Sequence, residues 1–300
     1  MAMVEQVPQS HLLLTTIAAA SALQAEIPWN LTCERLPDVL RYIRWPNDKD
    51  ELDDACRSLD YMLKRYNRQQ LKIPDSVMST VPFLIRYLTH SYRHVQRSSR
   101  GVLNTIASGS DDETQALLDA NILSVLNKFL DDPRKAAQAC TTILKLTAGT
   151  AQQIARIVET GVMAKVIALV KKLDLDIVTW REASWAVANA LDGRRSLDQF
   201  LLFVKDGAVM PLCQMLARHC EGFASDSEGG ALKSETTYRL LRCLDQCTIH
   251  LPTLRGQIPG DDFLIPKLLN LIEEVFAMKG YRDYRRESKS GVTRYLISKV

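Results

Sequence analysis

The sequence repeats itself about every 40 residues, and this period constrains the fold more than any other feature. Three predicted helix ends read alike, IASG ending at Gly109, LTAG ending at Gly149 and ALDG ending at Gly193, at spacings of 40 and 44 residues. A unit of this length cannot bury its apolar faces alone, whereas stacked copies can. The period therefore predicts an array of stacked repeats.

Each repeat contains three predicted helices. A polar start and a short apolar helix follow each glycine, then a second apolar helix, and finally the helix that ends at the next glycine. No sustained alternating run or Asn-Gly hairpin indicates a strand. We therefore predict an all-α fold, a right-handed α-α superhelix. The first apolar helices are 111–120, 150–161 and 195–207, and the second are 122–130, 162–173 and 208–216.

Helix stops and starts follow from the residues around these glycines. We expect Gly109, Gly149 and Gly193 to end helices where a left-handed backbone is cheap. Asp111, Asp112 and Ser196 are the expected caps of the helices that follow.

Composition indicates a soluble folded protein and excludes several functions. Charged residues make up 24% and hydrophobic residues 46% of the chain, and the net charge of +3 is too small to indicate nucleic-acid binding. The seven cysteines are scattered and lack a C-x-x-C pair, so we expect reduced buried thiols and no metal site.

No apolar run is long enough to cross a membrane. The run 11–25 resembles the apolar part of a signal peptide but has no basic residue before it, so we favour a buried helix.

No catalytic motif is present. The phosphate-binding glycine loops, the H-E-x-x-H zinc motif and the G-x-S-x-G nucleophile elbow are all missing, and no cofactor is implied. Stacked repeats present long grooves rather than closed pockets, which favours binding over catalysis. We therefore expect a protein that is not an enzyme.

The segment Glu182–Gly193, EASWAVANALDG, contains the most informative residues for binding. Trp185 and Asn189 lie one helical turn apart on the same face. An indole can pack on a long side chain or a cation, and a carboxamide can bind a peptide backbone. The alternative is that Trp185 only packs between adjacent helices.

The segments GSDDETQALLDANIL (109–123) and REASWAVAN (181–189) resemble the armadillo repeats of importin alpha, the nuclear-import adaptor. The resemblance covers nearly the whole chain but only the C-terminal half of that family. It implies a single armadillo-repeat solenoid over 1–300. The implied repeats are 1–35 as a partial cap, 36–77, 78–120, 121–161, 162–207, 208–258 with an acidic loop at 221–233, and 259–300 as a partial C-terminal cap.

The resemblance also implies a binding mode. In that family the third helix of each repeat lines a concave groove, where a Trp, an Asn four residues later and a nearby acid bind cargo. Trp185, Asn189 and Glu182 match this pattern. The family's basic segment for importin beta has no counterpart, so we expect no importin beta binding. The last repeats resemble those that engage the nuclear export receptor, and the implied location is cytoplasmic or nuclear.

The other repeats depart from this pattern. Their residues at the Trp and Asn positions are Arg57 and Tyr61, Gly101 and Thr105, Thr141 and Lys145, and Tyr238 and Arg242. Arg93 and Arg97 precede Gly101 on the same stripe, so we expect a locally basic groove that repels basic peptides. An ordinary solvated face is the alternative for the arginines at 93, 97 and 100.

Two functional hypotheses follow from these residues. The first is an importin-alpha-like protein that binds an extended peptide or protein in its groove, with a degenerate minor cargo site and a role in nuclear transport. The second is a repurposed scaffold that binds an acidic or folded partner and has no transport role. Nucleic-acid binding by the arginine face is a weaker third idea.

Overall fold

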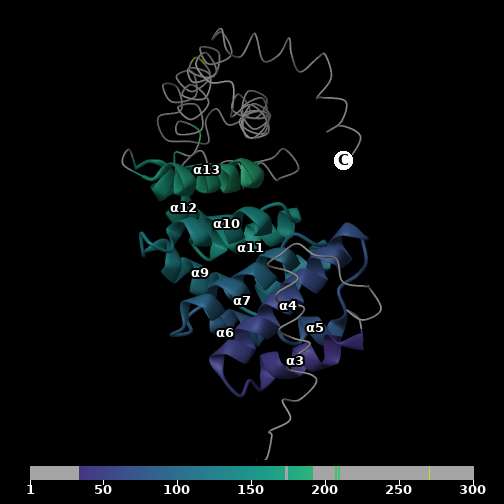
Figure 1. The fold of residues 1–300 in the computed structure, drawn as a ribbon. Coiled ribbons are helices and arrows are strands. Elements are labelled where there is room, and N and C mark those ends of the chain that lie inside the picture. The colour runs from purple at the N-terminus through teal and green to yellow at the C-terminus, as the bar shows by residue number, and fades with distance from the viewer. Residues whose placement is uncertain (1–33, 173–174, 192–206, 208, 210–269, 271–300) are drawn as a thin grey trace, which may run out of the picture. The chain divides into compact units, whose positions relative to one another are not determined.

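The computed structural model describes residues 34–172, 175–191, 207, 209 and 270, and every regular element in this part of the chain is helical (Figure 1). The helices are α3 (Leu36–Arg44), α4 (Lys49–Arg68), α5 (Asp75–Met78), α6 (Val81–Tyr87), α7 (Arg93–Ile106), α8 (Asp111–Asp119), α9 (Ile122–Leu130), α10 (Ala136–Leu146), α11 (Ala151–Glu159), α12 (Val162–Val170) and α13 (Ile177–Leu191).

The chain divides into two compact units, Met1–Asp132 and Pro133–Val300. Helices α3 to α9 belong to the first unit and α10 to α13 to the second. The repeat boundaries inferred from the sequence remain a prediction.

In the first unit, α4 and α7 form the most extensive helix pair, with α3 against α4 and α6 against α7. Leu59 and Leu63 of α4 and Leu103 and Ile106 of α7 are buried in its core. The Tyr87 hydroxyl of α6 donates to the carbonyl of Ile43 at the end of α3, 2.8 Å away. The exposed sides of α4 and α7 are therefore held next to one another.

In the second unit, α13 packs against α10 and α12. Its inward face is built from small residues, including Ala183 and Ala186, which are fully buried and let the helices approach closely. Cys140 and Ile143 of α10 and Val166 of α12 complete this core.

The glycines at the ends of the third helices have a different role from the one expected. Gly109 and Gly149 do not have a positive φ; among the described glycines, only Gly161 and Gly207 do. A Cβ atom at Gly109 would lie 1.7 Å from Oε2 of Glu113, and one at Gly149 would lie 2.1 Å from Oε1 of Gln153. The expectation of a left-handed backbone at these two glycines is therefore wrong, and both are there to leave room for a side chain.

These two side chains belong to capping boxes. Ser110, not Asp111 or Asp112, is the N-cap of α8: its hydroxyl accepts from the Glu113 N–H, and Glu113 accepts from the Ser110 N–H at 2.7 Å. Thr150 and Gln153 repeat this arrangement at α11. Each box folds the N3 side chain back over the glycine, which explains the recurrence of glycine. The prediction that Asp111 and Asp112 are caps is therefore wrong. The predicted cap Ser196 and helix stop Gly193 lie outside the described residues.

Left-handed positions lie instead at the joint between the first and second helices of a repeat, and at Gln70, with φ of 55°, just after α4. Asn121 has φ of 61° before α9, and Gly161 has φ of 75° before α12. Asparagine and glycine are the residues that tolerate this conformation most readily. Gly207, with φ of 72°, stands at the corresponding sequence position after 195–206.

Two described cysteines, Cys56 and Cys140, are buried and free. Burial raises the pKa of the Cys140 thiol from its ordinary value of 9.0 to about 12, with smaller contributions from Glu182 and Asp176. Burial also raises the pKa of Cys56, helped by Asp53 and Asp60.

These thiols predict a loss of stability in alkali. Because the folded state binds the thiol proton more tightly than the unfolded state, the full contribution is present below pH 9.0 and is lost as the pH rises toward about 12. We expect the free energy of unfolding of wild type to fall over this range, by up to roughly 1.4 kcal/mol per pH unit for each buried thiol. Urea unfolding at pH 7.5 and 10.5 would measure it. Cys140→Ala should show a smaller fall, and an equal fall in both proteins would contradict this role of Cys140.

Candidate functional site

The third helices α4, α7, α10 and α13 carry the residues that the sequence singled out for binding. In the second unit, α13 brings Trp185 and Asn189 to one half-buried face, as their spacing requires. The Asn189 side chain is already engaged, because its Nδ2 donates to the carbonyl oxygen of Leu144 on α10 at 3.2 Å. A carboxamide also carries an acceptor oxygen, which is the group that suits a peptide N–H.

The acidic residue of this face is also engaged. Glu182 is 9% exposed, and its Oε1 accepts from Arg181, 2.8 Å from Nη2 and 3.1 Å from Nε. The Arg181 side chain is the more exposed of the pair. A ligand cation would therefore have to compete with Arg181 for this carboxylate.

The matching residues of α10 are Thr141 and Lys145, both half-buried. The Thr141 hydroxyl donates to the Ala137 carbonyl one turn earlier in the same helix. Lys145 follows Leu144, whose carbonyl binds Asn189, and brings a cation to this part of the unit. The second unit thus combines an indole, a partly engaged amide and a lysine.

In the first unit, Arg57 lies between carboxylates rather than standing alone. Its Nε is 3.4 Å from Asp53 Oδ2, and its Nη2 pairs with Asp54. Tyr61, one turn further along α4, is half-buried with the Arg65 guanidinium 6.0 Å from its ring centre. The expectation of a basic groove is therefore wrong for α4, because the carboxylates of Asp53 and Asp54, one helical turn before Arg57, balance the charge of this arginine.

Thr105 is used inside the fold. It is 8% exposed, and its hydroxyl donates to Asp60 Oδ1 of α4 at 2.6 Å. Asn189 does the same in the other unit by bonding to the preceding third helix. In both units, the position assigned to peptide binding therefore also ties two third helices together.

The arginines of α7 are arranged differently. Arg93 and Arg97 are exposed and Arg100 is half-buried, and none of them forms an ion pair with the residues that the structure describes. Burial and the neighbouring Arg97 lower the pKa of Arg100. Arg97 remains a candidate binding residue, whereas Tyr238 and Arg242 lie outside the described residues.

Sequence reasoning missed several residues of these faces. Val178, 45% exposed, precedes Trp185 by two helical turns, and Arg181 precedes it by one. Counting four and seven residues back from Trp185 would have revealed both. Asp53 and Asp60 lie beside the stripe on the side of α4 that faces α7, and only the packing of the two helices reveals their role.

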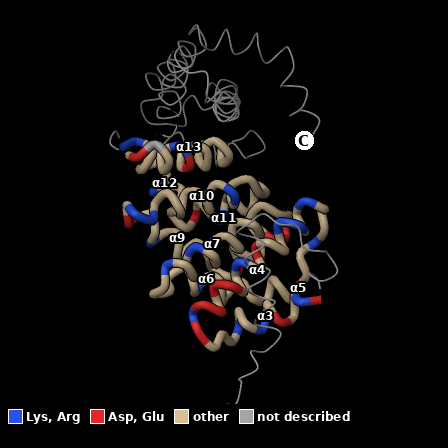
Figure 2. Tube along the Cα trace, viewed as in Figure 1, with Lys and Arg blue, Asp and Glu red and all other residues tan. Residues whose placement is uncertain are grey.

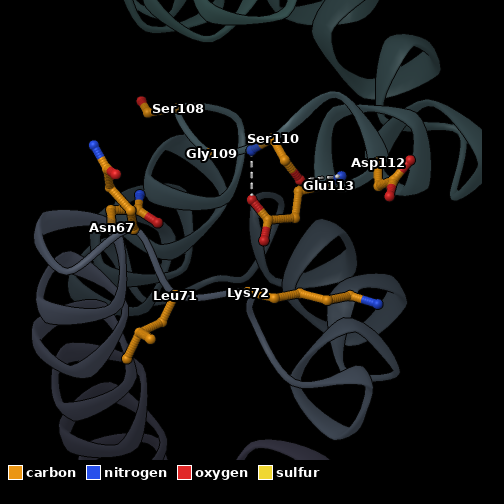
Figure 3. Close-up of a pocket in the computed structure, with 9 residues that line it drawn as sticks. Asn67, Leu71, Lys72, Ser108, Gly109, Ser110, Asp112 and Glu113 are labelled. Atoms are coloured by element: carbon orange, nitrogen blue, oxygen red, sulfur yellow. Dashed lines mark hydrogen bonds between the residues drawn. The ribbon is translucent and has the colours of Figure 1, made fainter.

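The first unit also has an open pocket of about 440 Å³ where α4, α7 and α8 end or begin (Figure 3). Asn67, Lys72 and Glu113 line it. The Glu113 carboxylate is occupied, since it accepts from the N–H groups of Ser110 and Ile73. Asn67 donates to the Thr105 carbonyl. The pocket therefore contains the polar joint between repeats.

Neither a metal site nor a membrane segment emerges from this part of the chain. No group of three or more potential metal ligands clusters among the described residues. None of their helices combines the length and apolar character needed to cross a membrane.

Sequence comparison identifies a relative of known type. No family model matches the chain. Over 135 residues, which is 44% of this chain, it is 31% identical to importin subunit alpha-1a of Oryza sativa subsp. japonica. The match spans 25% of that protein, about a quarter of its length.

Structural comparison identifies the fold. A designed armadillo repeat protein in complex with the peptide (KR)4 is similar over 80% of this chain and 99% of its own, with a TM-score of 0.54 and 22% identity. An engineered protein from a structural genomics consortium matches over 83% and 94% of the two chains, with a TM-score of 0.60 and 20% identity. A computationally designed armadillo repeat protein for modular peptide recognition has a TM-score of 0.56 and 22% identity, over 80% of this chain and 99% of its own.

These findings establish the fold class predicted from the repeat. The chain has an all-α armadillo-repeat fold, and part of its sequence is similar to importin subunit alpha-1a. The residues that contact a ligand, and the ligand itself, are matters of proposal.

Proposed function

We propose that this importin-alpha-like armadillo-repeat protein binds an extended peptide on the face of the third helix α13 and performs no chemistry. The observation that carries the proposal is the face of α13, where Trp185 is half-buried with Asn189 one turn after it and Val178 exposed before it. An accessible indole with an adjacent amide suits a peptide because it offers packing area at low entropic cost and a polar group for the backbone. The designed relative with bound (KR)4 supports a peptide as the class of ligand.

The pocket on α13 suits one side chain of the peptide. A long aliphatic or cationic stem would pack on the Trp185 indole, and the Asn189 carboxamide would bond to the peptide backbone. Arg181 already neutralises Glu182, so a peptide cation would gain less from the acid here than from an unpaired carboxylate.

Titration of fluorescent peptides against wild type and Trp185→Ala tests this proposal. We expect Trp185→Ala to weaken peptide binding by about 1–2 kcal/mol, roughly 5- to 30-fold in Kd, because truncating an aromatic anchor removes its packing. Leu71→Ala is the control, since it removes an exposed apolar side chain outside the third helices. Equal binding by wild type and Trp185→Ala would contradict the proposal.

A role in protein transport is the finer part of the proposal, supported by the similarity to an importin subunit. It predicts that wild type changes the nuclear fraction of a fluorescent reporter fused to the bound peptide, and that Trp185→Ala does not. A reporter that binds but stays outside would favour a scaffold without a transport role.

A further inference from the structure

The third helices differ sharply in charge, and α7 stands apart from the other three. Helix α4 has five carboxylates and five cationic side chains, so its formal charge is zero (Figure 2). Helix α13 has one of each, Arg181 and Glu182, and α10 has the single cation Lys145. Helix α7 has Arg93, Arg97 and Arg100 and no carboxylate. The largest charge on any described third helix therefore belongs to α7.

The carboxylates nearest to α7 are already engaged. Asp53 accepts from Ser98 of α7 and pairs with Arg57. Asp60 accepts from the Thr105 hydroxyl and lies 2.7 Å from Lys64 Nζ. These acids bond to other side chains of the α4–α7 joint, and no described carboxylate forms an ion pair with the arginines of α7.

Spacing places the arginines in one row. Positions 93, 97 and 100 differ by four and three residues, which puts them along one side of a helix. The buried residues of α7, among them Val95, Ser99 and Val102, occupy the other side. The row is therefore accessible along its length, with Arg93 and Arg97 exposed and Arg100 half-buried.

Gly101 gives α7 no side chain at the position where α13 carries Trp185, one turn after Arg97. A Cβ atom there would lie 3.4 Å from Asp60 Oδ2, which is ordinary contact, so packing does not demand a glycine. This position therefore faces the Asp60 carboxylate of α4 and adds no bulk beside the arginine row.

We propose that the row formed by Arg93, Arg97 and Arg100 is a subsite for an acidic stretch of a bound peptide. Three unpaired guanidinium groups at helical spacing offer charge-assisted, bidentate bonds to successive carboxylates. Burial, and after it repulsion from Arg97, lower the pKa of Arg100, and a carboxylate beside Arg100 would offset the repulsion. The subsite deepens the proposed function, since it adds a chemical preference to a peptide-binding face.

Three ligands distinguish the source of the negative charge. They are a glutamate-rich peptide, a lysine-rich peptide of equal length and a single-stranded oligonucleotide, each titrated by fluorescence anisotropy at two salt concentrations. We expect the acidic peptide to bind most tightly, with an affinity that falls as salt rises.

Arg97→Glu is the test variant, and Lys128→Glu is its control. Lys128 is exposed on α9 in the same unit, so both substitutions change the net charge equally. We expect Arg97→Glu to weaken the acidic peptide at least 10-fold and Lys128→Glu to change it less than 2-fold. Equal effects of the two variants, or tighter binding of the lysine-rich peptide, would overturn the subsite. So would an oligonucleotide that binds as tightly as the acidic peptide and depends equally on Arg97.

The outcome for Trp185→Ala separates this inference from the proposed function. Peptide binding that depends on Trp185 and not on Arg97 would overturn the acidic subsite and leave the proposed function intact. Failure of every peptide to bind would overturn both.

Discussion

Gly109→Ala should destabilise the first unit strongly although it adds one methyl group at a helix end. The new Cβ would lie 1.7 Å from Glu113 Oε2, so the carboxylate must move away. Glu113 would then lose its bonds to the Ser110 N–H at 2.7 Å and to the Ile73 N–H at 3.0 Å. We expect a loss of roughly 2–4 kcal/mol in the free energy of unfolding, combining overpacking with a lost capping box. Urea unfolding followed by circular dichroism would measure it.

Gly101→Ala is the matched control for this substitution. Gly101 lies inside α7, and the added Cβ would make only ordinary contact with Asp60 at 3.4 Å. Alanine is also the better helix former, so we expect no loss or a gain of up to about 1 kcal/mol. If both variants lose the same stability, steric conflict with Glu113 is not the cause.

A double substitution isolates that conflict. Glu113→Ala removes the side chain with which the Gly109→Ala methyl collides, so the second change should cost little once the first is present. We therefore expect the double variant to be markedly less destabilised than the sum of the two single variants. Additive losses would contradict the role assigned to Gly109.

Trp180→Ala should be the most destabilising change in the second unit. Trp180 is 8% exposed in the first turn of α13, and its Nε1 donates to the Val170 carbonyl at 3.2 Å. Truncation would leave a large cavity and an unpaired carbonyl, for a loss of about 3–5 kcal/mol in the free energy of unfolding. Trp180→Phe keeps most of the volume and should lose less than half of that.

Trp185→Ala is the comparison that separates the two indoles. Because Trp185 is half-buried on the outer face of α13, we expect its loss to lower stability by about 1–2 kcal/mol and to act mainly on binding. Thermal unfolding monitored by circular dichroism ranks the two variants. A larger loss for Trp185→Ala than for Trp180→Ala would show that Trp185 belongs to the core and is not a binding residue.

The helical period could be predicted from the sequence because it depends on local patterns. Apolar spacing and the recurring glycines predict helices that lie where α8 to α13 are observed. The capping boxes were also readable, since Gly109-Ser110 and Gly149-Thr150 are each followed by Glu or Gln three residues after the cap. Asp111 and Asp112 follow Ser110 directly and are also favoured N-cap residue types, so composition alone does not select Ser110.

The chemistry of the binding faces was less predictable because it depends on pairs about 45 residues apart. Nothing near Thr105 in the sequence indicates that its hydroxyl meets Asp60, and nothing near Asn189 indicates the Leu144 carbonyl. The stripe of residues at the Trp and Asn positions contains no carboxylate beside Arg57. The partners of Arg57, Asp53 and Asp54, lie one helical turn earlier on the same helix, where the i, i+3 and i+4 spacing could have placed them.

In the proposed binding mode, the bond between Asn189 and Leu144 links peptide binding to the packing of α10 against α13. A peptide that takes the Nδ2 hydrogens of Asn189 competes with the Leu144 carbonyl, whereas a peptide that uses Oδ1 leaves that bond intact. The first ligand type would therefore raise local opening at the end of α10 and the second would not, a difference that hydrogen exchange reports. Substitution of Asn189 would alter both the choice of ligand and the packing of α10 against α13, so these two properties cannot evolve independently at this residue.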